Sequence, residues 1–174
     1  MTIREIITVP NPLLKIISEP VKVIDDEVLS LIDDMIETMY AAPGIGLAAI
    51  QVGIPKRILV IDIARDDEAR NPLYFINPEI IDPTETLNSF EEGCLSVPGV
   101  WEEIERPDEC TVKYLDKNGV EQSVRCKGML ATVIQHEMDH LNGVVFVDHL
   151  SKLKRDRAIK KSIKSRNSET NNNE

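Results

Sequence analysis

Residues 129–141 read Met-Leu-Ala-Thr-Val-Ile-Gln-His-Glu-Met-Asp-His-Leu, and this stretch decides how the chain is built. Apolar residues recur through it and an Asn-Gly pair follows it, so a buried helix is predicted over this range. His136 and His140 are four residues apart and share one helix face, where two imidazoles can bind one metal ion. Glu137 is beside the first histidine, where its carboxylate can take a proton from a water activated by that metal. The spacing therefore predicts a hydrolytic metal site on a central helix.

A catalytic metal needs a third protein ligand, and the residues after His140 narrow the choice. In the metzincin pattern a third histidine stands where this chain has Phe146. A thermolysin-like site takes a downstream glutamate, but only Glu169 and Glu174 follow, in a tail expected to be disordered. His149 lies beyond the expected helix end and is interpreted as an ordinary surface residue. A cysteine is therefore the expected third ligand.

The composition indicates one globular domain without a membrane span. The 174 residues are 42% hydrophobic but only 4% aromatic, so aliphatic side chains must fill most of the core. No apolar run approaches the roughly 18 residues of a membrane helix, and the first ten residues resemble neither a secretion nor a transit signal. We therefore expect a cytoplasmic protein, whose three cysteines serve metal binding, catalysis or core packing rather than disulfides.

The net charge of −10 is unevenly distributed along the chain. Residues 151–166 hold eight of the 20 Lys and Arg residues and one acid, a net charge of +7, whereas residues 1–150 carry −15. The acidic body argues against broad nucleic-acid binding, DNA included. The basic segment indicates a polyanionic partner for itself alone.

Helices are expected near both ends of the chain. Residues 25–40 place apolar side chains at i, i+3 and i+4 behind an aspartate that can cap the first turn, and a Pro-Gly pair ends the pattern. The last helix is predicted over about 152–165. Residues 167–174 are polar and low in complexity and are predicted to be disordered.

Strands are predicted over residues 57–63, 74–76, 79–81, 109–115 and 120–126. Pro78 separates the second of these from the third, and residues 64–72 are expected to form a loop. An Asn-Gly pair between the last two strands predicts a hairpin. These elements predict an α+β fold, with antiparallel β-sheets packed around the HExxH-bearing helix and helices at both ends. Residues 1–150 are expected to form the catalytic domain, with 151–166 as its basic C-terminal helix.

Three segments resemble the signature motifs of bacterial, type 1-like peptide deformylases, in the order the family has them. They are Gly-Ile-Gly-Leu-Ala-Ala-Ile-Gln at 44–51, Glu-Gly-Cys-Leu-Ser at 92–96 and Gln-His-Glu-Met-Asp-His-Leu at 135–141. The resemblance covers about residues 1–165. It implies metal-dependent removal of the formyl group from the N-terminal formyl-methionine of newly made polypeptides, with release of formate.

The resemblance also assigns the metal ligands. It makes Cys94 the third ligand beside His136 and His140, which leaves a fourth position open, as in catalytic sites. The family characteristically uses Fe(II), and Ni(II), Co(II) or Zn(II) can substitute, although spacing alone suggests zinc. Metal-bound histidines usually donate their second N–H to an acceptor, and Asp139 and Glu92 are the candidates. The remaining cysteines, at 110 and 126, are expected to be inert core thiols.

The substrate site follows from the same resemblance. Gln51 and the backbone N–H of Leu95 are expected to bind the formyl oxygen, where negative charge develops. The Ile45–Gly46 backbone is expected to pair with the peptide as an added strand, and an apolar pocket takes the methionine side chain. The expected substrate-binding residues are Ile45, Gly46, Phe90, Gly93, Met129 and Val133.

One position departs from the family. Many members have an arginine three positions after the proline of the Gly-Cys-Leu-Ser-Val-Pro stretch, where this chain has Trp101. Either Arg106 substitutes for that arginine, or Trp101 forms a flat apolar rim. The basic helix at 151–166 is expected to engage ribosomal RNA, as in bacterial members with a long C-terminal helix.

Two other functions fit parts of the pattern. A zinc protease shares the HExxH motif but does not need a thiolate ligand. A ribosome-associated binding protein fits the basic helix but has no use for Glu137 beside an open metal position.

Overall fold

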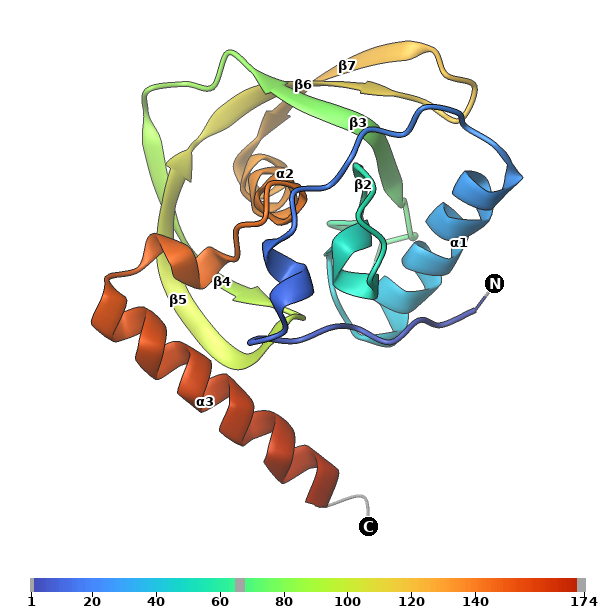
Figure 1. Cartoon of the computed structure of the whole chain (residues 1–174). Helices are drawn as coiled ribbons and strands as arrows, with labels where there is room; N and C mark the ends of the chain where they lie inside the picture. The colour runs from blue at the N-terminus through green and yellow to red at the C-terminus, as the bar shows by residue number, and fades with distance from the viewer. Residues whose placement is uncertain (1, 65–67, 172–174) are drawn as a thin grey trace.

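In the computed structural model, which describes residues 2–64 and 68–171, two antiparallel sheets curve around helix α2 (Gly128–Leu141) (Figure 1). The five-stranded sheet has the order β1-β2-β3-β6-β7, and β4 and β5 form a separate two-stranded sheet. The strands are β1 (Gly46–Ala48), β2 (Ile58–Ile61), β3 (Leu73–Ile81), β4 (Leu87–Cys94), β5 (Val97–Pro107), β6 (Glu109–Leu115) and β7 (Glu121–Lys127). This confirms the predicted α+β architecture.

Helix α2 is enclosed because apolar side chains project from most of its circumference. Residues 131–138 are all buried, and Ala131, Ile134 and Leu141 are fully inaccessible. They pack on the concave face of the five-stranded sheet through residues such as Phe75 and Val112. Polar residues on the same helix are thereby removed from water along with the apolar ones. The predicted helix is confirmed, one residue longer at its start.

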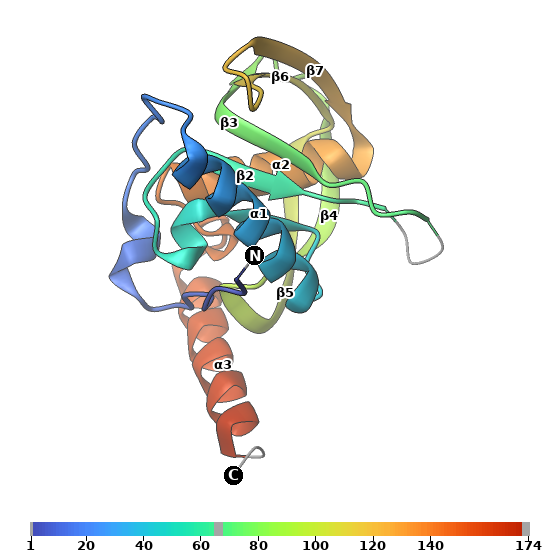
Figure 2. The same cartoon turned by 90° about the vertical axis from the view of Figure 1, so that its right-hand side faces the viewer.

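Helix α1 (Asp26–Ala41) covers β1 and β2 from the other side (Figure 2). The Asp25 carboxylate accepts a hydrogen bond from the Val28 N–H at 3.0 Å, so the predicted cap is present. On the apolar stripe of α1, Ile32, Met35 and Met39 are fully buried. The short 3-10 helices η1 (Pro12–Lys15), η2 (Ala49–Val52) and η3 (Phe146–His149) complete the connections.

The strand predictions were right for β2 and for the β6–β7 hairpin. They were wrong at Pro78, because β3 runs through it as one strand with a bulge between Ile76 and Glu79. Asn77 adopts φ 50° there, and its side-chain amide bonds both the N–H and the C=O of Val21 at 2.7 and 2.9 Å. The bulge thus accommodates the proline without ending the strand.

Strands β1, β4 and β5 were not predicted. Charged and polar residues at alternate positions on β4 and β5 face solvent, so the hydrophobic signal of these strands is weak. Of the predicted 64–72 loop, residue 64 and residues 68–72 have no regular structure, and residues 65–67 lie outside the described ranges. Cys110 and Cys126 face each other across β6 and β7 and are fully buried, as expected of core thiols.

Helix α3 (Lys152–Asn171) packs on β5 by one face and then extends beyond the body (Figure 2). Ala158 and Ser162 on this helix are buried. Gly99, at φ 74°, lies against it, and an added Cβ there would be 2.6 Å from Ser165 Oγ. The helix continues to Asn171, past the predicted end at about residue 165, because adding residues to a helix already docked costs little; residues 172–174 lie outside the described ranges. None of the helices within the described ranges is long and apolar enough to cross a bilayer.

Candidate metal centre

The end of β4 and one face of α2 bring together the three residues expected to hold a metal. One ligand atom from each of Cys94, His136 and His140 lies within 4.8 Å of the other two. The Cys94 thiol sulfur is 3.2 Å from His140 Nε2. A thiolate and two imidazoles match the donor set of catalytic sites for transition metals, so these side chains fit a metal ion.

His136 is held in place by a buried carboxylate. Its Nδ1–H donates to Glu92 Oε2 at 2.8 Å, which directs Nε2 toward Cys94. Glu92 in turn accepts hydrogen bonds from Arg106 at 2.6 and 3.0 Å. Burial opposes ionisation of Glu92, but the bonds from His136 and Arg106 outweigh it and lower the pKa of that carboxyl. Phe146, at the position of the metzincin histidine, stacks on the His136 ring with centroids 5.8 Å apart.

The expected partnership between Asp139 and a metal-binding histidine is not formed. Asp139 Oδ2 accepts hydrogen bonds from Arg106 at 2.9 Å and from His149 at 2.7 Å. Among the described residues, nothing bonds the buried Nδ1 of His140. Consecutive helix residues point about 100° apart, so a carboxylate adjacent in sequence faces away from its neighbour's ring. His149 is exposed, as predicted, and it is also tied to α2 through its bond to Asp139.

Glu137 is buried beside the cluster with one oxygen unpaired. Its side chain is 4% exposed, and no described residue bonds its Oε2. Burial raises the pKa of this carboxyl to about 7, which suits a group that accepts and returns a proton near neutral pH. An added Cβ on Gly46 would overlap Oε1 and Cδ of Glu137. Gly46 therefore allows the carboxylate to reach the β1 edge.

Gln51 is fixed at both ends of its amide. Its Oε1 accepts the Ala48 N–H at 2.8 Å, and its Nε2 lies 3.1 Å from Ser96 Oγ and 3.6 Å from Cys94 Sγ. The amide N–H₂ group is thus directed toward the three side chains that fit a metal ion. Ser96, which is fully buried, was quoted in the motif but given no role. Its place as a polar residue inside an otherwise apolar Leu-Ser-Val run is the signal that could have identified it.

A cavity of about 530 Å³ opens beside the cluster, between the β1 and β4 edges. Cys94, Leu95, His136 and Glu137 line it. So do all six residues expected to bind substrate, Ile45, Gly46, Phe90, Gly93, Met129 and Val133. Sequence reasoning missed Thr132, Val100 and Glu91 in this lining.

Residue 101 is where this chain departs from the family pattern, and the structure decides between the two expectations for it. Arg106 is 6% exposed and forms ion pairs with Glu92 and Asp139, so it cannot substitute for a peptide-binding arginine. Trp101 is 63% exposed and lines the cavity, where it forms part of the rim. The idea that Arg106 takes over the role is therefore wrong.

Comparison with known proteins agrees with this geometry over nearly the whole chain. A family model described as polypeptide deformylase matches residues 3–156. The peptide deformylase of Maricaulis maris is 59% identical over 161 residues, which cover 92% of each chain. That of Pelagibacter ubique is 57% identical, covering 94% of this chain and 95% of its own.

Solved structures give the same result. A crystal structure of peptide deformylase from Ehrlichia chaffeensis matches with a TM-score of 0.92 at 44% identity, covering 97% of this chain and 99% of that one. The same organism's enzyme in complex with actinonin matches with a TM-score of 0.90 at 47% identity, covering 95% and 98%. The chain belongs to the polypeptide deformylase family, metal-dependent hydrolases that remove the N-formyl group from nascent peptides.

Proposed function

We propose that this chain deformylates N-formyl-methionyl peptides with Cys94, His136 and His140 as metal ligands and Glu137 as the proton-transfer group. The observation that carries the proposal is the buried Oε2 of Glu137, unpaired among the described residues and lining an apolar cavity beside the ligand cluster. A metal ion held there supplies Lewis acidity and acidifies water.

Glu137 accounts for the proton movements of the reaction. Its carboxylate accepts a proton from the water that attacks the formyl carbon. It then delivers that proton to the methionine nitrogen as the carbon–nitrogen bond breaks, so the products are formate and a free amino terminus. Burial of the carboxyl raises its pKa, which favours its taking up the proton that it later returns.

Gln51 and Leu95 serve the formyl oxygen. The Gln51 amide is held by Ala48 and Ser96, and its second N–H points to the Cys94 sulfur, so the amide is oriented toward the site before substrate arrives. The backbone N–H of Leu95 is the second donor. Removing one such preorganised donor typically lowers the rate by about 10²–10³-fold.

The peptide lies in the cavity as an added strand. The cavity lies between β1 and β4, each an edge strand of its sheet, and edge strands offer free backbone groups. The Ile45–Gly46 backbone pairs with the substrate on one side, and Gly93 lines the cavity on the other. The methionine side chain packs against Phe90, Met129 and Val133. Actinonin, bound to the Ehrlichia enzyme, is expected to occupy the same cavity.

Fe(II) is the proposed resident metal, with Ni(II), Co(II) and Zn(II) able to substitute. The thiolate and two imidazoles accept all four ions, so supply in the cell sets occupancy. The cytoplasm, where nascent chains and reduced cysteines coexist, is the proposed location.

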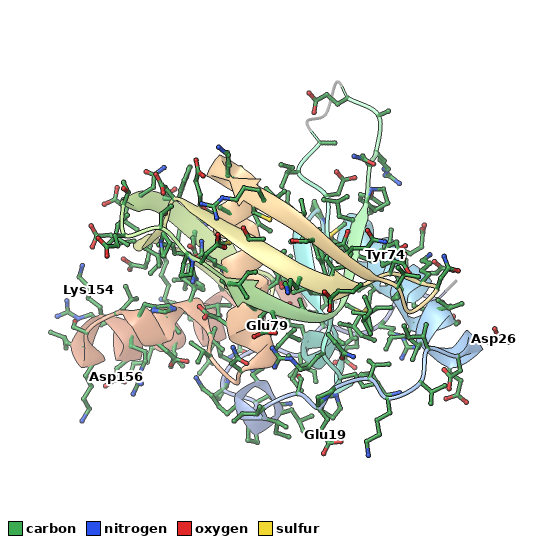
Figure 3. All side chains as sticks on the ribbon, turned by 90° about the horizontal axis from the view of Figure 1, so that it is seen from above. Glu19, Asp26, Tyr74, Glu79, Lys154 and Asp156 are labelled. Carbon is green, nitrogen blue, oxygen red and sulfur yellow. The ribbon has the colours of Figure 1, made fainter. Side chains whose placement is uncertain are left out.

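Helix α3 is the proposed ribosome-binding element. Seven of its eight basic residues in 151–166 are exposed, and they lie on a helix that docks by a single face. Lys154 lies in the first turn of this helix, where Figure 3 shows it at the edge of the molecule. A positive, projecting helix on an acidic body suits attraction to ribosomal RNA without bringing RNA to the active site.

Formate release from formyl-Met-Ala-Ser tests the proposal, with protein purified without oxygen and loaded with Fe(II) or Ni(II). Acetyl-Met-Ala-Ser and an unblocked longer peptide serve as controls. The proposal predicts rapid release of formate, no deacetylation and no internal cleavage. Internal cleavage without formate release would favour a protease, and no reaction at full metal occupancy would favour a binding protein.

A further inference from the structure

The outer face of the β4–β5 ribbon carries an exposed tryptophan next to a cross-strand pair of glutamates. Gly93 pairs with Trp101, and Glu91 pairs with Glu103. Since alternate residues of a strand share a face, these four positions lie on one side of the ribbon. That side faces solvent, because Glu91, Trp101 and Glu103 are exposed whereas Glu92 and Ile104, at intervening positions, are buried.

The indole is positioned by Gly93 rather than buried in a core. A Cβ added to Gly93 would be 2.5 Å from Cζ3 and 2.7 Å from Cε3 of Trp101, so the six-membered ring lies directly on the glycine. With one side held in this way, 63% of the residue remains exposed. Trp101 and Glu91 both line the cavity that also contains Met129 and Glu137. The tryptophan is therefore at the mouth of the site.

The charges around the indole are of one sign. Within the described part of the chain, neither Glu91 nor Glu103 forms an ion pair. A cation placed over an indole face is attracted by the ring, and carboxylates beside the ring add to the attraction. An aromatic face with two uncompensated carboxylates beside it thus suits an ammonium or guanidinium group.

We propose that Trp101, Glu91 and Glu103 form a specificity subsite that favours a lysine or arginine side chain just after the formyl-methionine. The inference rests on the proposed deformylation, because it needs the methionine side chain in the apolar part of the cavity. The rest of the peptide then leaves between the strand edges, past Gly93 and across the indole. The subsite selects among nascent chains and takes no part in bond breaking.

The kinetic test compares kcat/KM for formyl-Met peptides with Lys, Gln or Glu at the second or third position, using metal-loaded protein. At one of these positions the Lys peptide should exceed the Glu peptide by about fivefold, a ratio that falls at high salt. Trp101→Leu and the double variant E91Q/E103Q should each bring the ratio close to one. Glu121→Gln, which removes one carboxylate at the far end of the β6–β7 hairpin, should leave the ratio unchanged.

Direct binding provides a second readout, because Trp101 is the single tryptophan of the chain. In a Glu137→Gln background, the Lys peptide should change the indole fluorescence and bind several-fold more tightly than the Glu peptide. Equal kcat/KM for all three peptides, or a Lys preference that survives both sets of variants, would overturn the subsite while leaving deformylation intact. Absence of turnover with the Gln peptide would instead count against the proposed function.

Discussion

Helices α2 and α3 of this chain are used in opposite ways. On α2 the residues from Ala131 to Met138 are all buried, and polar side chains such as His136 are oriented by named partners. On α3 the body contacts a single stripe, and the basic side chains project into solvent. Burial therefore fixes the orientation of the polar side chains on α2. The basic side chains of α3 need only a helix that docks on the body by one face.

The largest expected effect is on the cluster beside α2. Cys94→Ala removes the thiolate and should abolish stable metal binding and lower kcat/KM for formyl-Met-Ala-Ser by more than about 10³-fold. Metal content by elemental analysis and formate release are the measurements. Cys110→Ala is the matched control, since that thiol is buried on β6 away from the cluster. Full metal content in Cys94→Ala would contradict its assignment as a ligand.

The next contrast is in stability. Ile134 on α2 is fully buried, so Ile134→Ala should lower the free energy of unfolding by about 2–5 kcal/mol. Leu153 on α3 is 62% exposed, and Leu153→Ala should change it by less than about 0.5 kcal/mol. Urea unfolding of both variants with the same metal loading gives the comparison. Equal losses would show that α3 is as deeply integrated in the fold as α2.

A smaller effect is expected for a residue that bonds a metal ligand without binding the metal itself. Glu92→Gln weakens the acceptor for His136 Nδ1–H and should reduce metal affinity about 10–100-fold. Competition with a chromophoric chelator measures it, with circular dichroism to show that the fold survives. Glu105→Gln, exposed on the same ribbon, should leave affinity unchanged. Unaltered affinity in Glu92→Gln would mean that the hydrogen bond does not tune the site.

The smallest effect on catalysis is expected on α3. The triple variant K160E/K161E/K164E reverses charges on exposed positions, so kcat/KM for a tripeptide should stay within about twofold of the original. Cosedimentation with ribosomes should fall sharply in the same variant and, for the original protein, should weaken with salt. Lys22→Glu, exposed on the body, controls for a general charge effect. Unchanged cosedimentation would rule out α3 as the ribosome-binding element.

The same contrast explains what could be predicted from sequence. Helix α2 and the two histidines were predictable because periodicity and spacing are local signals, and Cys94 followed from a short motif. The continuity of β3 through Pro78 was not, since the bulge depends on Asn77 bonding Val21, 56 residues away in the chain. The β4–β5 ribbon was missed because its exposed glutamates conceal the alternation. Asp139 was misassigned because only the packed structure shows which way a side chain on α2 points.

Glu137 is the central residue of the proposed mechanism, and it acts beside a metal that it does not itself hold. The direct test is Glu137→Gln, which keeps the side chain's size, assayed for metal content and for formate release from formyl-Met-Ala-Ser. We predict full metal occupancy and a rate reduced by about 10²–10⁴-fold. A variant that keeps its metal and releases formate at the original rate would contradict the assignment of Glu137.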